Sequence, residues 1–255
     1  RSIHTLLKNW DEECPLTREE AVEVLNLPEE EMDSLMECAY ALRTKYKGKK
    51  VSVQLLTNVR SGNCTQNCAY CAQSKDSQAE IEKYKRVSDE KLYGDNDLVD
   101  EKHLARHCIG LSGIGFSDEE IEDLADRIRE MKKKDTQICC SIGFLTEKQA
   151  RILKDAGLDR INHNLNSSRS FYPEICTTHT YDQRVNNIKM LQSLGFEICS
   201  GGIVGMGESK EDIVDMLMDL REINPESVPI NFLLPIPGTK LADRDISELT
   251  PDYCM

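Results

Sequence analysis

Three cysteines within one short stretch are the most specific chemical feature of this sequence: Cys64, Cys68 and Cys71 in NCTQNCAYC. Structural zinc sites usually take four closed ligands from paired CxxC units, which this stretch lacks, and the nearest histidine, His103, lies at the far end of an expected helix. A 4Fe–4S cube held by three thiolates keeps one iron open for a ligand that is not protein. The CxxxCxxC spacing therefore favours such a cube, with zinc ligation as the weaker alternative.

The composition narrows the classes of protein that could carry this stretch. The 255 residues fit one large domain, and the formal net charge of −13 repels phosphate backbones, so we expect no nucleic-acid partner. No apolar run approaches the roughly 18 residues of a membrane span, and no signal-peptide pattern is visible, so we expect a cytoplasmic protein without membrane contact. Eleven cysteines, an odd number, favour metal or cluster ligation over disulfides.

Alternating strand-like and helix-like segments define the expected fold. Residues 1–50 read as a helical cap, in which Thr17 and Glu20 match a capping box. After the cap, short β-like runs alternate with amphipathic segments, the pattern of an α/β fold with a parallel sheet, here a (β/α)8 TIM-type barrel. We expect strands at 51–57, 107–112, 137–142, 159–165, 197–204 and 228–234, with helices at 88–104, 118–133, 146–156, 180–194 and 209–222 between them. We therefore assign residues 51–255 to one barrel domain, whose last two units would lie beyond Met255.

Side-chain alternation along these strands predicts which residues face the helices. Alternate residues of a barrel strand point to opposite sides, and the apolar side packs against the helices. This rule turns Cys139 inward, makes the adjacent Cys140 a packing residue and places His163 on the apolar side of its strand. It also sends the apolar residues of the last strand toward the helices: Val228, Ile230, Phe232 and Leu234.

The opposite side of the same strands carries thiols and amides. Across five successive strands the interior would receive Cys108, Cys139, Asn162, Asn164, Asn166, Cys199 and Asn231. A packed barrel core would show Val, Ile and Leu at these places, so the set predicts a bound cofactor or substrate. A single inward cysteine is more often structural than functional. We assign no role to the cysteines outside these patterns, which are Cys14, Cys38, Cys140, Cys176 and Cys254.

The cysteine motif, with Tyr70 before its last cysteine, resembles that of the radical S-adenosylmethionine enzymes. Longer segments resemble the biotin synthase family over nearly the whole chain: AGLDRINHNLNSSRSFYPEICTTHTYDQR, ICSGGIVGMGES and ESVPINFLLPIPGTKLAD. The resemblance implies a cube on the three clustered cysteines, whose open iron chelates the amino and carboxylate groups of S-adenosylmethionine. One-electron reduction then yields a 5′-deoxyadenosyl radical, with which the family inserts sulfur into dethiobiotin.

The same resemblance implies roles for particular residues. By position, Arg184 would hold the carboxylate of S-adenosylmethionine, and Asn164 and Asn166 would contact its ribose. The segment GIVGMGE would lie beside its adenine. The resulting cofactor-binding positions are Tyr70, Asn164, Asn166, Arg184, Gly202, Gly205 and Glu208. The ureido ring of dethiobiotin would bind Asn164 and Asn231.

Cys108, Cys139 and Cys199 match the three cysteines that hold the family's second, sulfur-donating cluster, of the 2Fe–2S type or larger. The resemblance further implies cluster-assembly proteins and an electron donor such as flavodoxin or ferredoxin, and it is compatible with a homodimer. Two alternatives stay open. A related radical enzyme on another small substrate, such as those of hydrogenase maturation or methylornithine synthesis, would share the first motif and the barrel. A non-catalytic zinc-binding or scaffold protein would also account for eleven cysteines on an acidic chain.

Overall fold

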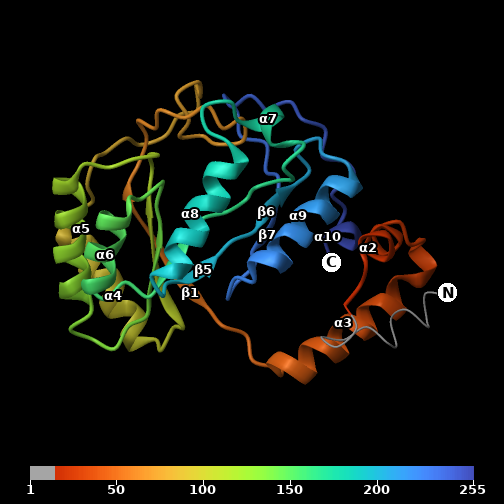
Figure 1. The fold of residues 1–255 in the computed structure, drawn as a ribbon, viewed down its shortest axis with the longest axis horizontal. Coiled ribbons are helices and arrows are strands. Elements are labelled where there is room, and N and C mark those ends of the chain that lie inside the picture. Colours follow the sequence, from red (N-terminus) through yellow and green to blue (C-terminus); the bar gives the residue numbers. More distant parts are fainter. Residues whose placement is uncertain (1–14) are drawn as a thin grey trace.

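The computed structural model describes residues 15–255, so Cys14 and the first part of the expected helical cap lie outside the described residues. The described chain opens with α2 (Arg18–Leu25), a short 3-10 turn η1 (Glu29–Glu31) and α3 (Met32–Lys47). Thr17 and Glu20 form the predicted capping box at the start of α2. Figure 1 shows α3 lying apart from the central sheet, to which a stretch of extended chain connects it.

A parallel sheet forms the centre of the molecule (Figure 1). Its first five strands pair in sequence order: β1 (Gln54–Arg60), β2 (Arg106–Leu111), β3 (Ile138–Ser141), β4 (Arg160–Asn162) and β5 (Glu197–Cys199). A second parallel pair consists of β6 (Gly202–Val204) and β7 (Ile230–Phe232). Single bridges from Asn166 to Gly202 and from Cys199 to Ser227 join the two groups. The strand order is that of the expected (β/α) barrel, open between β1 and β7 within the described residues.

The strand expected at residues 197–204 is divided at Ser200 and Gly201 into β5 and β6. The backbone N–H of Gly201 donates to the side-chain oxygen of Asn164 (3.0 Å) instead of continuing a strand ladder. A Cβ on Gly201 would lie 1.8 Å from the carbonyl oxygen of Pro229, so this close approach requires glycine. The six expected strands are therefore confirmed, one of them interrupted.

Helices follow the strands, and the longer ones cover the outer side of the sheet (Figure 1). They are α4 (Asp89–Glu101), α5 (Asp118–Met131), α6 (Glu147–Asp155), α7 (Tyr172–Ile175), α8 (Tyr181–Ser193), α9 (Lys210–Ile223) and α10 (Pro251–Cys254). The five long helices each begin after a Ser or Thr that accepts a hydrogen bond from the first turn. Outward strand residues form one fully buried layer against them: Ile109, Cys140, Ile161 and Ile198. The predicted packing role of Cys140 is thereby confirmed.

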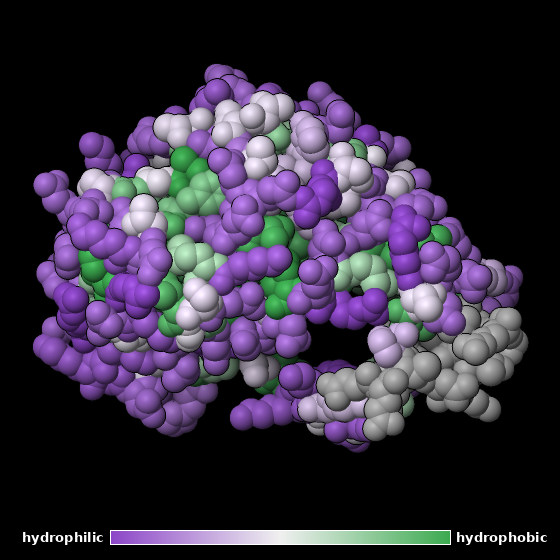
Figure 2. All heavy atoms as spheres, in the orientation of Figure 1, coloured by the Kyte–Doolittle hydropathy of each residue, from purple (hydrophilic) through white to green (hydrophobic). Residues whose placement is uncertain are grey.

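Polar contacts join α2 and the residue stretch just before it to α9. Arg18 pairs with Asp215 (2.6 Å), and Arg221 donates to the carbonyl oxygen of Leu16 (2.7 Å). Figure 2 shows a mostly hydrophilic surface with scattered hydrophobic patches, in keeping with the acidic composition. In the part of the chain that the structure describes, we find no helix with the length and apolar character of a membrane span.

The prediction for the outer face of the last strand was wrong. Val228, Ile230 and Leu234 are 45%, 40% and 74% exposed, whereas Leu233, on the inward face, is buried. Within residues 15–255, β7 pairs with β6 alone and its outer side chains lack a covering helix, so side-chain alternation could not translate into burial.

Candidate functional site

A cavity of about 260 Å³ opens at the carboxyl ends of the strands, where barrel folds place their active-site loops. The loop after β1 contributes Cys64, Cys68 and Cys71, which we call the loop triplet. Backbone and side chains that follow β2, β3 and β4 form the opposite walls, and His179 and Arg184 close it from the start of α8. Segments far apart in the sequence thus converge on the three cysteines.

Hydrogen bonds to neighbouring segments position the loop triplet. The N–H of Gly62 donates to the Gln73 side chain (2.7 Å), and the carbonyl of Gly62 accepts a hydrogen bond from the Ser112 hydroxyl (2.6 Å). Further along the loop, the N–H of Ala69 donates to the carbonyl of Ile175 (2.8 Å). The loop is therefore anchored both to the strand that follows β1 in the sheet and to the segment before α8.

Two thiols of the loop triplet resist ionisation when no cation is near. A hydrogen bond with Cys176 and burial raise the pKa of the Cys68 thiol, and burial raises the pKa of Cys71. Because the thiolate is the form that ligates metals, ionisation of these thiols is coupled to the arrival of a cation. Clustered thiols of this kind, one buried and two partly buried, fit an iron–sulfur cube.

Arg184 is the only Lys, Arg, Asp or Glu side chain on the wall of the cavity, counted over the described residues. Its guanidinium donates to the Tyr172 hydroxyl (2.5 Å) and to the backbone carbonyl of Asn164 (3.1 Å), and it lies 2.9 Å from Nε2 of His179. A half-buried cation facing no carboxylate in its cavity favours a ligand that brings a negative charge. A carboxylate group of a cofactor meets that requirement.

A second group of cysteines lies on the strands below the cavity, and we call Cys108, Cys139 and Cys199 the strand set. Cys108 and Cys139 are register partners on β2 and β3, and their thiols hydrogen-bond to each other. Cys199 ends β5, where its sulfur accepts a hydrogen bond from the Asn162 amide (3.2 Å). The predicted inward orientation of these three cysteines is confirmed, while Cys140 points into the outer core.

The surroundings of the strand set are cationic. The hydrogen bond from Cys139, followed by the charges of Arg106 and Arg160, lowers the pKa of Cys108 against the effect of burial. Both arginines share the carboxylate of Glu197, at 3.2 and 2.7 Å. One terminal nitrogen of Arg106 is buried without a hydrogen-bond partner. Thiols next to excess positive charge, with an unused donor nearby, fit an anionic cluster with thiolate ligands.

Of the expected cofactor-binding positions, four line the cavity, namely Tyr70, Asn164, Asn166 and Arg184, and three do not, namely Gly202, Gly205 and Glu208. The Glu208 carboxylate accepts hydrogen bonds from the N–H groups of Gly205 (2.6 Å) and Met206 (2.8 Å). It therefore closes the turn after β6 rather than facing the cavity. The adenine contact of this segment stays a prediction.

The two expected substrate-binding amides are also placed differently. Asn164 lies on the cavity wall, with its side-chain oxygen engaged by Gly201 (3.0 Å). Asn231 is a register partner of Ile203 but is exposed and lies outside the cavity. Their shared role toward one ligand stays a prediction.

His163 is buried and packs against Phe144, with ring centroids 5.3 Å apart. Burial and the nearby charge of Arg184 lower its pKa to about 3, so the imidazole is neutral. The expected packing role fits these contacts, although one edge of the ring also reaches the cavity wall.

Four residues near the loop triplet escaped the sequence reasoning: Gln66, Tyr172, Cys176 and His179. Nδ1 of His179 lies 2.7 Å from Oε1 of Gln66, and its Nε2 lies 2.7 Å from the Tyr172 hydroxyl. The sulfur of Cys176 lies 3.8 Å from that of Cys68. Loop residues carry no periodic pattern, so the only available signal was the density of reactive side chains in CTTH before α8.

Comparison with known proteins agrees with this geometry. The family model described as the radical SAM superfamily matches residues 58–220, which include the loop triplet, the strand set and Arg184. Among solved structures, methylornithine synthase PylB is similar with a TM-score of 0.85 and 19% identity, covering 98% of this chain and 73% of that one. The hydrogenase maturase HydG is similar with a TM-score of 0.80 and 19% identity, covering 98% and 57%. The chain is thus a member of the radical SAM superfamily, and these two structures show the fold alone.

Curated relatives narrow the assignment. The biotin synthase of Geobacillus kaustophilus (strain HTA426) is 42% identical over 241 residues, which is 94% of this chain and 72% of that protein. The biotin synthase of Bacillus subtilis (strain 168) is 40% identical over 94% of this chain and 71% of that protein. The chain belongs to the biotin synthase family. This membership favours biotin synthase function over the other radical enzymes that the sequence left open, and it rules out a non-catalytic scaffold protein.

Proposed function

We propose that this chain inserts sulfur into dethiobiotin, with the loop triplet and the strand set holding two separate iron–sulfur clusters. The observation that carries the proposal is the presence of two cysteine sets in one interior. Three cysteines lie on a loop at the cavity, and three lie on strands below it. A radical enzyme that needs one cluster only has no use for the second set.

The loop triplet would hold a 4Fe–4S cube through three thiolates, leaving one iron for S-adenosylmethionine. When bound, the cube and S-adenosylmethionine supply a 5′-deoxyadenosyl radical able to take hydrogen from unactivated carbon. Arg184 binds the cofactor carboxylate through its planar fork, which Tyr172 and the carbonyl of Asn164 orient. The surrounding wall would complete the cofactor site with Tyr70, Asn164 and Asn166. The turn after β6, with Gly202, Gly205 and Glu208, would lie beside the adenine.

The strand set would hold the auxiliary cluster, 2Fe–2S or larger, that donates sulfur. Arg106 and Arg160 stabilise the thiolate forms of its ligands and a net negative cluster. The substrate would lie between the two cysteine sets, where Asn164 and Asn231 bind its ureido ring through amide hydrogen bonds.

Further parts of the proposal concern the partners and the organisation of the chain. An electron donor of the flavodoxin or ferredoxin class would reduce the cube, cluster-assembly proteins would load both sites, and the proposal is compatible with a homodimer. The division of the chain into a cap of residues 1–50 and a catalytic barrel of residues 51–255 is supported, for the described part of the cap, by the contacts of Arg18 and Leu16 with α9.

The proposal is tested by separating formation of the radical from its use. Anaerobically reconstituted protein is incubated with S-adenosylmethionine, a reductant and dethiobiotin, and 5′-deoxyadenosine and biotin are both quantified. We expect Cys199→Ala to abolish biotin while 5′-deoxyadenosine persists, because only the sulfur-donating cluster is lost. Cys140→Ala, on the outer face of β3, is the matched control and should keep both products. Wild-type amounts of biotin from Cys199→Ala would contradict the proposed role of the strand set.

A further inference from the structure

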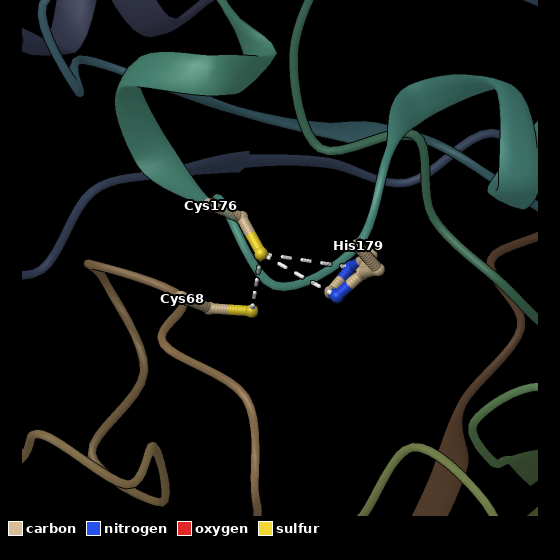
Figure 3. Close-up of side chains that lie close together, drawn as sticks. All are labelled: Cys68, Cys176 and His179. Atoms are coloured by element: carbon tan, nitrogen blue, oxygen red, sulfur yellow. Dashed lines mark hydrogen bonds between the residues drawn. The ribbon is translucent and has the colours of Figure 1, made fainter.

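Cys68 also belongs to a third group of metal-ligating side chains, whose other two members, Cys176 and His179, the cube would not use. Its sulfur is 3.8 Å from that of Cys176, and the Cys176 sulfur is 3.4 Å from Nδ1 of His179. Figure 3 shows Cys176 between the other two, with all three side chains directed at one another. All three are buried. We propose that Cys68, Cys176 and His179 form a site for one zinc-like cation in the cluster-free chain, and that this cation competes with cube assembly.

The distances are those of ligands that share a single ion. In a tetrahedral zinc site, the usual zinc–sulfur and zinc–nitrogen bond lengths place two sulfurs about 3.8 Å apart and a sulfur and a nitrogen about 3.6 Å apart. The observed distances are close to these values: 3.8 Å between the sulfurs of Cys68 and Cys176, and 3.4 Å between the Cys176 sulfur and Nδ1 of His179. Two thiols and one imidazole are also a donor set that suits zinc.

This spacing distinguishes the group from both cysteine sets of the proposed function. Among the described residues, Cys68, Cys176 and His179 are the one group whose three ligand atoms all lie within 4.8 Å of one another. Cluster ligands bind different irons and can stand further apart, whereas the ligands of one ion cannot. The loop triplet and the strand set have the wider arrangement, and only the third group has the spacing of a mononuclear site.

The neighbours of His179 complete the site. When Nδ1 faces the ion, the ring proton sits on Nε2 and is donated to the Tyr172 oxygen 2.7 Å away, in place of the hydrogen bonds that Nε2 otherwise accepts from Arg184 at 3.1 and 2.9 Å. Arg184 keeps its bonds to Tyr172 and to the Asn164 carbonyl. Gln66, whose oxygen lies 2.7 Å from Nδ1, is freed by the loss of that proton and is the nearest candidate for a fourth ligand.

An ion can reach the group from two sides. Cys68 and His179 line the cavity of the loop triplet, and Cys176 and His179 line a second cavity of about 360 Å³ beside α7. Binding of a divalent cation displaces the two thiol protons to solvent, so one doubly charged ion replaces two protons and the charge balances. The third ligand stays a neutral imidazole.

Competition follows because Cys68 cannot serve the cation and the cube at once. This consequence rests on the proposed cube on the loop triplet, whereas the cation site itself rests on the distances alone. When Cys68 ligates a zinc ion, only two of the three cysteines of the loop triplet can ligate the cube.

Cobalt(II) titration of the cluster-free 255-residue chain, reduced and under anaerobic conditions, tests the site. Tetrahedral cobalt with thiolate ligands gives charge-transfer and visible ligand-field bands, and zinc displaces it. We expect Cys176→Ser to bind one cobalt ion per chain less than wild type, or to bind it at least tenfold more weakly. Cys64→Ser and Cys71→Ser should keep this ion, because neither residue belongs to the site. Taking the difference between variants removes any cobalt bound by the strand set.

A second measurement separates this inference from the proposed function. Iron and acid-labile sulfide are counted after reconstitution: Cys176→Ser should assemble the cube like wild type, and Cys64→Ser should not. Zinc added first should at least halve iron uptake into the cube of wild type and leave Cys176→Ser unaffected. If Cys176→Ser binds cobalt like wild type, or if Cys64→Ser and Cys71→Ser lose the same ion, the cation site is overturned and the cube stands. If Cys176→Ser does not fold, Cys176→Ala takes its place in both measurements, and loss of the same ion from Cys64→Ser and Cys71→Ser still overturns the site. If wild type assembles no cube, the proposed function fails instead.

Discussion

The loop triplet and the strand set reach the same interior by different means. The loop triplet takes its spacing from the chain itself and its position from a few hydrogen bonds at Gly62 and Ala69. The strand set spans more than ninety positions and meets only because β2, β3, β4 and β5 keep a fixed register. The loop triplet can therefore be recognised from a short stretch of sequence. The three cysteines of the strand set come together only if the whole sheet forms.

We expect the largest effect from a substitution that removes one cysteine of the loop triplet and leaves the sheet undisturbed. We expect Cys71→Ala to lower 5′-deoxyadenosine formation by at least about a hundredfold, since losing a direct metal ligand costs more than losing an outer-shell partner. The melting temperature of the cluster-free variant should stay close to that of wild type. Cys38→Ala, in α3, serves as the control for thiol removal. Normal cofactor cleavage by Cys71→Ala would show that the loop does not hold the cube.

The next largest effect is a loss of stability, caused by a substitution in the sheet that positions the strand set. Gly201→Ala should lower the free energy of unfolding by about 3 kcal/mol, because its Cβ would meet the Pro229 carbonyl at 1.8 Å. Urea denaturation measures this loss. Gly94→Ala is the matched control, since its Cβ meets nothing within 4 Å inside α4, and it should stabilise the chain by about 0.5–1 kcal/mol. Equal stabilities of the two variants would contradict the close approach at Gly201.

We expect a smaller effect from a substitution of Arg184, the charged side chain on the cavity wall. Arg184→Lys keeps the charge but loses the planar fork, so the KM for S-adenosylmethionine should rise about tenfold, in line with the value of a hydrogen bond to a charged group. Steady-state kinetics of 5′-deoxyadenosine formation provide the measurement. Arg169→Lys, an exposed partner of Asp182, should leave KM unchanged. If both variants behave alike, Arg184 does not bind the carboxylate.

The smallest effect concerns the tie between α9 and the loop after β4. Burial acts to raise the pKa of Asp212, but hydrogen bonds from Ser168, Ser170 and Ser209 lower it to about 2. The folded pKa is thus below the ordinary 3.8, so the stabilisation is present above that value and is lost as pH falls toward 2. Between pH 6 and pH 3, wild type should lose up to about 1 kcal/mol more unfolding free energy than Asp212→Asn. Parallel losses in both proteins would rule out this contribution.

Sequence reasoning succeeded where the chemistry is local or strictly periodic. The alternation of strand residues separated Cys139 from Cys140, and the structure places the first in the interior and the second in the outer core. Helix starts were readable because Ser and Thr caps act within one turn, as at Thr17. These signals depend on neighbours within a few residues, so no knowledge of the folded chain is needed.

Contacts between distant segments could not be predicted in this way. Cys176 meets Cys68 across 108 positions, and no periodic pattern marks either loop. The division between β5 and β6 arises from the Asn164 side chain, which takes the N–H of Gly201 out of the strand ladder. The burial of Leu233 and the exposure of Ile230 follow from what covers β7, a property of the assembled sheet.

The contacts of the loop after β1 have a consequence for the order in which a protease can cut the chain. The Asn67 side-chain oxygen accepts a hydrogen bond from the N–H of Thr177 (3.0 Å), and the N–H of Ala69 donates to the carbonyl of Ile175 (2.8 Å). Proteases cut segments that open locally, and opening this loop means breaking its bonds to a segment more than a hundred positions later in the chain. Limited proteolysis should therefore cut the loop after β1 later than exposed turns of the same chain.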